Sequence, residues 1–254
     1  MGTIEVVLGD ITRQQVDIIV TAANESLLGG GGVDGAIHRA AGPRLAEAGS
    51  KLAPLAPGRA VATPAFDLAP VKHVIHTVGP VWEDGEQGED EVLLSCYGES
   101  VLLAEDLGAN SIAFPAIATG THGFPVERAA RIAALAVRSM RVPDEVLLVA
   151  FDQETCDALT RSLAEPIEEW CPTCGEKAIP IVFGRPVPEA FPAADAGLIA
   201  LGGCLVSGDG TDPHWQCPQL HRWTGGPLGG HSSSAVISEA VAITLGEDHG
   251  RSVP

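Results

Sequence analysis

Basic residues are scarce in this sequence. Lys and Arg together number 15 against 33 Asp and Glu, which gives a formal net charge of -18. A surface with this charge repels the phosphate backbone of nucleic acids, so nonspecific nucleic-acid binding is not expected. Aromatic residues are also few, at 4%, but 45% of the chain is hydrophobic and 19% is charged. This composition is typical of a globular protein and excludes a disordered, collagen-like or coiled-coil chain.

Long apolar runs are absent as well. The N-terminus, MGTIEVVLGD, has no basic region followed by an apolar stretch, which a secretory signal would need. No apolar run approaches the ~18 residues that a membrane-spanning helix requires. We therefore expect a soluble, cytoplasmic protein that does not associate with membranes.

Two parts of different composition follow each other along the chain. Residues 1–165 alternate β-rich apolar runs with helical periodicity, which predicts an α/β fold with helices on the faces of a sheet. Residues 166–223 are rich in Pro, Gly and Cys, with few runs long enough for a helix or an interior strand, and are expected to form a small module. Residues 224–254 are expected to be a linker with a short terminal helix near 234–245.

The periodicity of the first part predicts individual elements. The expected strands are Ile4–Leu8, Asp17–Ala22, Ala60–Thr63, His73–Thr77, Ser111–Pro115 and Glu145–Phe151. The expected helices are Asp34–Ala48, Asp90–Leu107, Val126–Met140 and Glu154–Leu163.

The strongest local signal is a glycine-rich segment that joins a predicted strand to a predicted helix. It contains four consecutive glycines, Gly29–Gly32. Glycine lets the backbone approach a ligand closely, and the N–H groups at a helix start favour an anion, so we predict phosphate binding. Gly30, Gly32 and Gly35 match G-x-G-x-x-G, but they do not follow the strand directly and no acidic residue ends a second strand at the expected distance. The match to a nicotinamide-dinucleotide fold is therefore weak, and no P-loop sequence occurs.

Five ordered motifs resemble one known family. They are Gly9-Asp-Ile-Thr12, Asp17-Ile-Ile-Val-Thr-Ala-Ala-Asn24, the Gly29–Gly42 segment, Val74-Ile-His-Thr-Val-Gly-Pro80 and Ala118-Thr-Gly-Thr-His-Gly-Phe-Pro125. Residues 1–165 thereby resemble a macrodomain of the MacroD type, a group that binds and hydrolyses ADP-ribose derivatives. The resemblance implies a three-layer fold in which a mixed central sheet is flanked by helices and the ligand lies at the strand ends.

The resemblance also implies a set of ligand-binding residues. Asp10 and the backbone of Ile11 would hold the adenine ring, and Phe151 would stack on it, a contact worth about 1–3 kcal/mol per base. Main-chain amides of two loops would hold the diphosphate, which explains how an acidic protein binds a dianion without lysines. The first loop contributes Gly30, Gly31, Gly32, Val33 and Gly35, and the second contributes Thr119, Gly120, Thr121, His122, Gly123 and Phe124.

The catalytic pair implied by the resemblance is Asn24 and Asp34. Asn24 would hold the ribose hydroxyls, and either Asp34 or a substrate phosphate oxygen would deprotonate the attacking water. Two positions depart from the family pattern. Thr21 stands where many hydrolases have Asn, and His122 stands where an aromatic ring is common. His122 is interpreted as a flat face against the ribose, with proton transfer as the alternative.

Several candidate residues also have purely structural interpretations. Asp34 just ahead of a helix is explained by N-capping alone, although its neighbours favour a functional role. His38, His73 and His76 are expected to be hydrogen-bonded packing histidines, and Cys96 and Cys156 buried thiols. The acidic stretch 84–91 is expected to be a solvated loop.

The C-terminal part contains a candidate metal site that partly resembles a zinc ribbon. Cys171-Pro-Thr-Cys174-Gly is a zinc-knuckle sequence, and Cys204 and Cys217 would complete a four-thiolate site. A regular second knuckle would have Cys at position 220, where this chain has Leu220, so Cys204, His214 and His221 all remain candidates for the fourth ligand. A structural zinc is expected, with no catalytic cofactor; the alternative is a ribbon that has lost its metal.

We therefore predict a hydrolase that removes ADP-ribose from modified macromolecules, on protein acidic side chains or nucleic acid, or that deacetylates O-acetyl-ADP-ribose. A reader module that binds ADP-ribose or modified proteins without cleavage is the main alternative. An RNA-binding macrodomain is a third alternative, against which the net charge of -18 argues.

Overall fold

The computed structural model describes residues 3–139, 143–164, 169–171, 173–174, 176–183, 190–203, 213 and 215–223. The chain divides into two compact units, one formed by Met1–Val137 with Val142–Glu165 and the other by Arg138–Arg141 with Pro166–Pro254. Each unit is described by itself.

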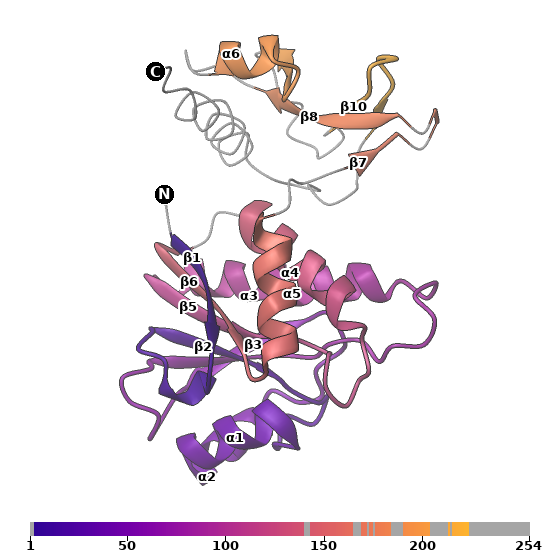
Figure 1. Cartoon of the computed structure of the whole chain (residues 1–254). Helices are drawn as coiled ribbons and strands as arrows, with labels where there is room; N and C mark the ends of the chain where they lie inside the picture. The colour runs from indigo at the N-terminus through magenta and orange to yellow at the C-terminus, as the bar shows by residue number, and fades with distance from the viewer. Residues whose placement is uncertain are drawn as a thin grey trace. The chain divides into compact units, whose positions relative to one another are not determined.

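The first unit is built on a six-stranded mixed sheet (Figure 1). The strands are β1 (Thr3–Leu8), β2 (Ile18–Ala22), β3 (Ala60–Pro64), β4 (His73–Thr77), β5 (Ser111–Pro115) and β6 (Glu145–Ala150). Their order across the sheet is β1-β6-β5-β2-β4-β3. All neighbouring pairs are parallel except β3 and β4, which are antiparallel. The six predicted strands are confirmed, each to within one residue at either end.

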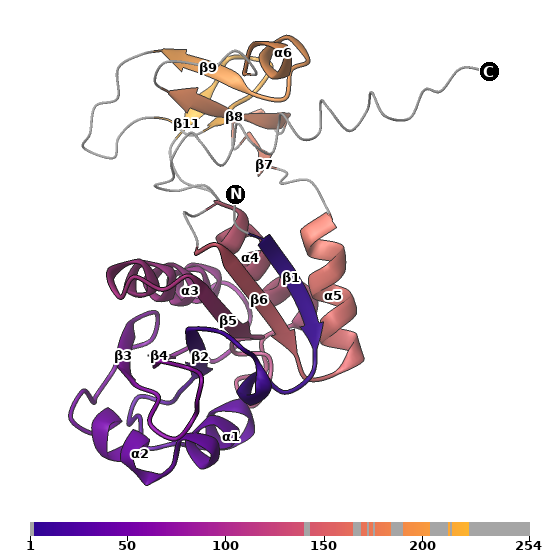
Figure 2. The ribbon, with the colours of Figure 1, turned by 90° about the vertical axis from the view of Figure 1, so that its left-hand side faces the viewer.

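Helices cover both faces of this sheet. They are α1 (Gly32–Ala41), α2 (Pro43–Gly49), α3 (Glu89–Asp106), α4 (Val126–Ser139) and α5 (Gln153–Ala164), with a short 3-10 helix, η1 (Ile11–Arg13). Figure 2 shows α5 beside β1 and β6, both of which it contacts, while α1 contacts β2. This arrangement confirms the predicted three-layer fold. None of the described helices has the length and apolar character that crossing a membrane requires.

Alternating strand residues face the two helical layers. Ile19, Ala113 and Leu147 pack in one cluster with Ile37 and Leu45 of α1 and α2. On the opposite face, the ring of Phe114 in β5 lies 5.2 Å from the ring of Tyr97 in α3. Because successive side chains of a strand point to opposite faces, the sheet contributes to two hydrophobic cores, one on each face.

One helix prediction is wrong. The sequence predicts a single helix over 34–48, but the structure breaks it at Gly42 into α1 and α2. Gly42 has φ of +78°, and a Cβ at this position would lie only 2.7 Å from Asp67 Oδ2. Pro43 then begins α2, where its fixed φ and missing N–H fit the first helical turn. The apolar periodicity continues across the break, so it does not reveal the turn.

The second unit contains short strands and one short helix. These are β7 (Glu169–Trp170), β8 (Lys177–Phe183), α6 (Ala190–Asp195), β9 (Ala200–Gly203), β10 (Trp215–Gln216) and β11 (Arg222–Trp223). β8 pairs with β7, β9 and β10, and β10 pairs with β11. β8 is not predicted from the sequence, although it is the longest strand described in this unit and pairs with β7, β9 and β10. The predicted linker and terminal helix, 224–254, lie outside the described residues.

Candidate active site

A cavity opens at the carboxyl ends of the central strands. Its volume is about 240 Å³. Five parallel strands end at this edge of the sheet, which is where α/β proteins bind ligands. The lining residues come from the loops after β2, β4 and β5 and from the start of α1: Ala22, Ala23, Asn24, Gly30, Gly31, Gly32, Val33, Asp34, Gly79, Ala116, Ala118, Gly120, Thr121 and His122.

The glycine segment places the N-terminus of α1 at the cavity. Gly31 is the N-cap residue and offers no side chain to cap the helix. Gly29 and Gly32 have φ of +89° and +58°, a region that residues with a Cβ rarely adopt. The first N–H groups of a helix have no intrahelical partner and carry the positive end of its dipole. This end of the cavity is therefore suited to an anion.

Asp34 lies inside the first turn of α1, not ahead of it, so the N-cap interpretation is wrong. Its carboxylate is buried, and Oδ1 accepts a hydrogen bond of 2.9 Å from the hydroxyl of Thr21 in β2. Oδ2 is also buried and has no partner among the described residues. A Cβ at Gly30 would lie 3.5 Å from this oxygen and 3.4 Å from Asn24 Nδ2. Glycine at position 30 thus leaves open the space in front of both side chains.

Burial raises the pKa of the Asp34 carboxyl above its usual range. The hydrogen bond from Thr21 and the nearby His38 act in the opposite direction but do not cancel the effect of burial. A carboxyl with a raised pKa accepts protons more readily than an ordinary aspartate. Asp34 is therefore suited to general-base catalysis.

Two histidines extend this buried polar group. His38 Nε2 lies 3.6 Å from Asp34 Oδ1, and the rings of His38 and His76 are 6.1 Å apart. His76 Nε2 lies 3.0 Å from Thr63 Oγ1. Burial, together with the neighbouring His38, lowers the pKa of His76 to about 4. His38 Nε2 and His76 Nδ1 are buried without a hydrogen-bond partner among the described residues, which differs from the fully hydrogen-bonded histidines that the sequence analysis expected.

Asn24 lies on the cavity wall and also shapes the glycine loop. Its Oδ1 accepts hydrogen bonds from the backbone N–H and the hydroxyl of Ser26, at 3.0 and 2.5 Å. Its Nδ2 donates to the carbonyl oxygen of Gly29 at 3.3 Å. The side chain thus closes the turn that leads into the glycines.

The second predicted loop forms the opposite wall of the cavity. Gly120, Thr121 and His122 line it, and His122 Nδ1 donates to the carbonyl of Pro80 at 3.0 Å. The other residues predicted for this loop do not line the cavity. The hydroxyl of Thr119 donates to Ala116 O, and Phe124 is buried with its ring 4.7 Å from that of Trp82.

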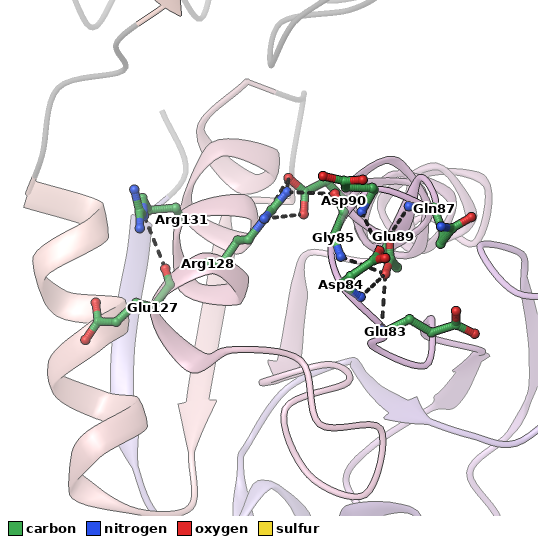
Figure 3. A network of polar contacts seen from close by, with 10 residues as sticks. Glu83, Asp84, Gly85, Gln87, Glu89, Asp90, Glu127, Arg128 and Arg131 are labelled. Atoms are coloured by element: carbon green, nitrogen blue, oxygen red, sulfur yellow. Dashed lines mark hydrogen bonds and ion pairs between the residues drawn. The ribbon is translucent and has the colours of Figure 1, made fainter.

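Contacts through Trp82 and Arg128 support this wall, and the pairing of Arg128 with Asp90 is drawn in Figure 3. Trp82 donates its backbone N–H to the carbonyl of His122 at 2.9 Å. The guanidinium of Arg128 lies 5.1 Å above the Trp82 ring and forms a bidentate pair with Asp90, with contacts of 2.7–3.0 Å. The network therefore connects the second loop to α3 and α4.

Glu89 organises the neighbouring loop, which is visible in the same view (Figure 3). Its carboxylate accepts backbone N–H groups from Glu83, Asp84, Gly85 and Gln87 at 2.7–3.4 Å. Burial alone would raise the pKa of Glu89, but these hydrogen bonds lower it to about 2. The acidic composition of residues 84–91 predicts a solvated loop. That expectation is wrong for Glu89, which is buried.

The residues expected to contact adenine lie at the same edge of the sheet. Asp10 follows β1 and Phe151 follows β6, and these strands pair as far as Leu8 and Ala150. Asp10 Oδ1 accepts bonds from the backbone N–H and hydroxyl of Thr12, and Ile11 is buried. The Phe151 side chain is 87% exposed, so its ring is free to stack against a ligand.

Comparison with known proteins identifies the family. The model of the Macro domain matches residues 20–133. A "Macro domain-containing protein" of Methanosarcina mazei is 51% identical over 161 residues, which cover 62% of this chain and 86% of that protein. The chain belongs to the macro domain family.

Further relatives of this macro domain have more specific names. An "O-acetyl-ADP-ribose deacetylase" of Escherichia fergusonii is 49% identical over 174 residues, covering 65% of this chain and 98% of that protein. A mutant macrodomain of Oceanobacillus iheyensis, solved with ADPR, matches with a TM-score of 0.61 and 38% identity over 64% of this chain and 92% of that one. Each match leaves more than a third of this chain uncovered.

Three residues of the macro domain site were not singled out as site residues from the sequence. Thr21 was noted only as a departure from the family pattern, yet it donates to Asp34. His38 and His76, expected to be packing residues, each place a ring nitrogen within 4.8 Å of a carboxylate oxygen of Asp34. The spacing of Asp34 and His38, one helical turn apart, was the available signal for His38. No local signal connects Thr21 or His76 to Asp34, because they come from neighbouring strands.

The candidate metal ligands lie in the second unit. Cys171, Cys174, Cys217 and His221 place one ligand atom each within 4.8 Å of all the others. Of the four predicted thiolates, Cys204 lies outside the described residues, as does His214.

Proposed function

We propose that this macro domain binds ADP-ribose and hydrolyses esters attached to its distal ribose. The observation that carries this proposal is Asp34, which lines a cavity bounded by two loops rich in main-chain donors and whose buried Oδ2 has no hydrogen-bond partner in the described part of the chain. The names of the relatives, which include an O-acetyl-ADP-ribose deacetylase, support the same activity.

Binding of the diphosphate would rely on backbone N–H groups of the start of α1 and of Gly120 to His122. These donors are uncharged, so the chain would bind a dianion despite its net charge of -18. Adenine would lie between the turn that follows Asp10 and the exposed ring of Phe151. The distal ribose would then reach the part of the cavity lined by Asn24 and Asp34.

The proposed chemistry is attack of water on the acyl carbonyl of the ester. Asp34 Oδ2 would accept a proton from the water as its oxygen bonds to the carbonyl carbon. The tetrahedral intermediate would then collapse, breaking the carbon–oxygen bond to the ribose, and the proton would pass to the departing ribose hydroxyl. A phosphate oxygen of the substrate is the alternative base. Candidate substrates with such an ester are O-acetyl-ADP-ribose and ADP-ribose linked to acidic side chains of proteins. ADP-ribose linked to nucleic acid has no acyl carbonyl, and its release would need attack of the water at C1 of the distal ribose, with the proton passing to the departing nucleic-acid group.

The alternative function is a reader that binds ADP-ribose without cleaving its esters. A reader needs the donor loops but has no need of a carboxylate with a raised pKa at the ribose end. Burying a carboxylate oxygen without a partner costs stability. The presence of such an oxygen at the cavity therefore favours the enzyme.

The variant Asp34→Asn tests the proposal because it keeps the shape of the side chain and removes its basicity. We expect calorimetry to show that the affinity of this variant for ADP-ribose stays within a few-fold of that of the wild type. Ester hydrolysis should fall by about 10²–10⁴-fold, as is usual for loss of a general base. O-acetyl-ADP-ribose and mono-ADP-ribosylated protein should be assayed in parallel to define the substrate.

Unchanged turnover in Asp34→Asn would remove this carboxylate from the mechanism and favour the substrate phosphate as the base. Binding of ADP-ribose with no hydrolysis of any ester by the wild type would support the reader. No detectable binding of ADP-ribose at millimolar concentration would contradict both functions.

A further inference from the structure

Two hairpin turns of the second unit bring three thiols and an imidazole together. Cys171 directly follows β7, and its N–H donates to the carbonyl of Glu176 at 2.8 Å, closing the turn that leads into β8. Cys217 directly follows β10, and its N–H donates to the carbonyl of His221, which precedes β11, at 3.1 Å. Each turn therefore presents two of the four candidate ligands.

Three of the six distances between these ligand atoms match those around a tetrahedral zinc ion, and all six are within 4.8 Å. Zn–S bonds of about 2.3 Å and Zn–N bonds of about 2.0–2.1 Å separate two sulfurs by about 3.8 Å and a sulfur and a nitrogen by about 3.5 Å. The Cys174 and Cys217 sulfurs are 3.6 Å apart, and His221 Nδ1 lies 3.5 Å from the sulfurs of both Cys171 and Cys217.

A disulfide does not explain this cluster. The sulfurs of Cys174 and Cys217 are 3.6 Å apart, whereas a disulfide bond is about 2.05 Å long. Three thiols and an imidazole also bring more donors together than one disulfide requires. The backbone N–H of Thr173 points at the sulfur of Cys171, at 3.4 Å. This contact is the kind of support that a thiolate ligand receives from a knuckle turn.

The geometry points to a zinc site formed by Cys171, Cys174, Cys217 and His221. The second knuckle departs from a regular Cys-x-x-Cys because Leu220 takes the position of the usual cysteine. Leu220 has φ of +62° and is exposed, and the next residue, His221, supplies the fourth ligand instead. Three thiolates and one imidazole are a ligand set typical of zinc.

The role of this ion would be structural. Four protein ligands complete a tetrahedral shell and leave no open position for a catalytic water. The strands that carry the ligands are short, since β7, β10 and β11 have two residues each. A zinc ion would join the β7–β8 hairpin to the β10–β11 hairpin and would couple the folding of both to metal binding. This inference does not depend on the proposed function of the macro domain.

Zinc analysis of the full-length chain tests the site. We expect one zinc ion per chain after purification under reducing conditions, and Co²⁺ substitution should give the absorption of a tetrahedral thiolate complex. Removing a residue that only hydrogen-bonds to a metal ligand weakens metal binding by about 10–100-fold. Cys217→Ser and His221→Ala each remove a ligand itself, so they should weaken zinc binding more. His221→Cys should restore zinc binding with one more thiolate, and Cys204→Ser, the control, should keep the zinc.

Hydrogen exchange gives a readout that does not depend on the ligand variants. A chelator should remove protection from residues 169–183 and 215–223 while leaving β5 and β6 of the first unit unchanged. Absence of zinc from the wild type, even after reconstitution, would overturn the proposal. Loss of zinc in Cys204→Ser but not in His221→Ala would overturn the ligand set.

Discussion

The hydroxyl of Thr21 and the carboxylate of Asp34 are joined by a buried hydrogen bond of 2.9 Å that connects strand β2 to the first turn of α1. It fixes one oxygen of the carboxylate and leaves the other without a hydrogen-bond partner among the residues that the structure describes. The orientation of the proposed base is therefore determined by a residue outside the cavity lining.

Replacing Thr21 with Val removes this hydrogen bond with little change in side-chain size. We expect a loss of about 1–3 kcal/mol in the free energy of unfolding, because a buried carboxylate oxygen loses its donor. Since the hydrogen bond lowers the pKa of Asp34, its removal should raise that pKa further. The acidic limb of the kcat/KM profile should move to higher pH.

The matched control for this variant is Thr21→Ser, which keeps the hydroxyl. It should retain the wild-type pH profile, and chemical denaturation should show most of the lost stability restored. An acidic limb that does not move in Thr21→Val would show that Asp34 is not the titrating base.

Replacing Gly30 with Ala places a methyl group 3.4 Å from Asn24 Nδ2 and 3.5 Å from Asp34 Oδ2. These are ordinary contact distances, so the free energy of unfolding should change by less than about 1 kcal/mol. Hydrolysis should fall by about 100-fold, the usual effect of displacing a reacting group by roughly 1 Å.

The contrasting variant is Gly35→Ala. A Cβ at Gly35 would lie only 2.3 Å from the carbonyl oxygen of Gly30, so this variant should lose stability as well as activity. Wild-type turnover in Gly30→Ala would mean that the space between Asn24 and Asp34 is not used by the reacting groups.

Removing the exposed ring of Phe151 tests the adenine site. Phe151→Ala should weaken ADP-ribose binding by about 1–3 kcal/mol, the worth of one base stacked on an aromatic ring. The melting temperature should hardly change, because the side chain is 87% exposed. Calorimetry with ADP-ribose and with ribose 5-phosphate separates the stacking of adenine from the binding of ribose and phosphate, since only ADP-ribose carries adenine. Equal losses for both ligands would argue against stacking.

The carboxylate of Glu89 should make the stability of the first unit depend on pH. Its pKa is lowered from 4.5 to about 2, so its contribution is complete above pH 4.5 and is lost as the pH falls towards 2. Glu89→Gln should therefore be less stable than the wild type at pH 7, and this difference should shrink below pH 4.5. Urea denaturation between pH 7 and pH 3 measures it.

The exposed Glu86 on the same loop provides the control. Glu86→Gln should have little effect at any pH, because its side chain makes none of the hydrogen bonds that Glu89 makes. If the free energies of unfolding of the wild type and Glu89→Gln differed by the same amount at pH 7 and pH 3, ionisation of Glu89 would not stabilise the first unit.

The sequence predicts the strands of the first unit well because they are short β-rich apolar runs, some of them buried throughout, such as β2 and β5, and it predicts the helices from their apolar periodicity. It does not predict the break at Gly42, where the periodicity continues although the backbone turns. It also misses Glu89, whose role depends on four backbone N–H groups gathered by the loop. Local patterns contain no information about such converging contacts.

The site is predictable only in part, for the same reason. The glycine run and Asp34 lie close together in the sequence, so the motif that contains them identifies both as site candidates. The neighbours of Asp34 come from other elements: Thr21, its hydrogen-bond donor, lies in β2, and the nearby His76 lies in β4. In the second unit, the Cys171 knuckle is evident from its spacing. His221 emerges as a ligand only when the second turn brings it next to Cys217.

The support of the second loop by Trp82 and Arg128 has a consequence for ligand affinity. A loop already held in its bound shape loses little conformational entropy when a ligand arrives, so more of the contact energy remains as affinity. Side chains outside the cavity lining, such as Asp90, would thereby affect the dissociation constant through the rigidity of the wall. Among related chains, we therefore expect substitutions on α3 and α4, as well as those in the cavity, to change the affinity for the ligand.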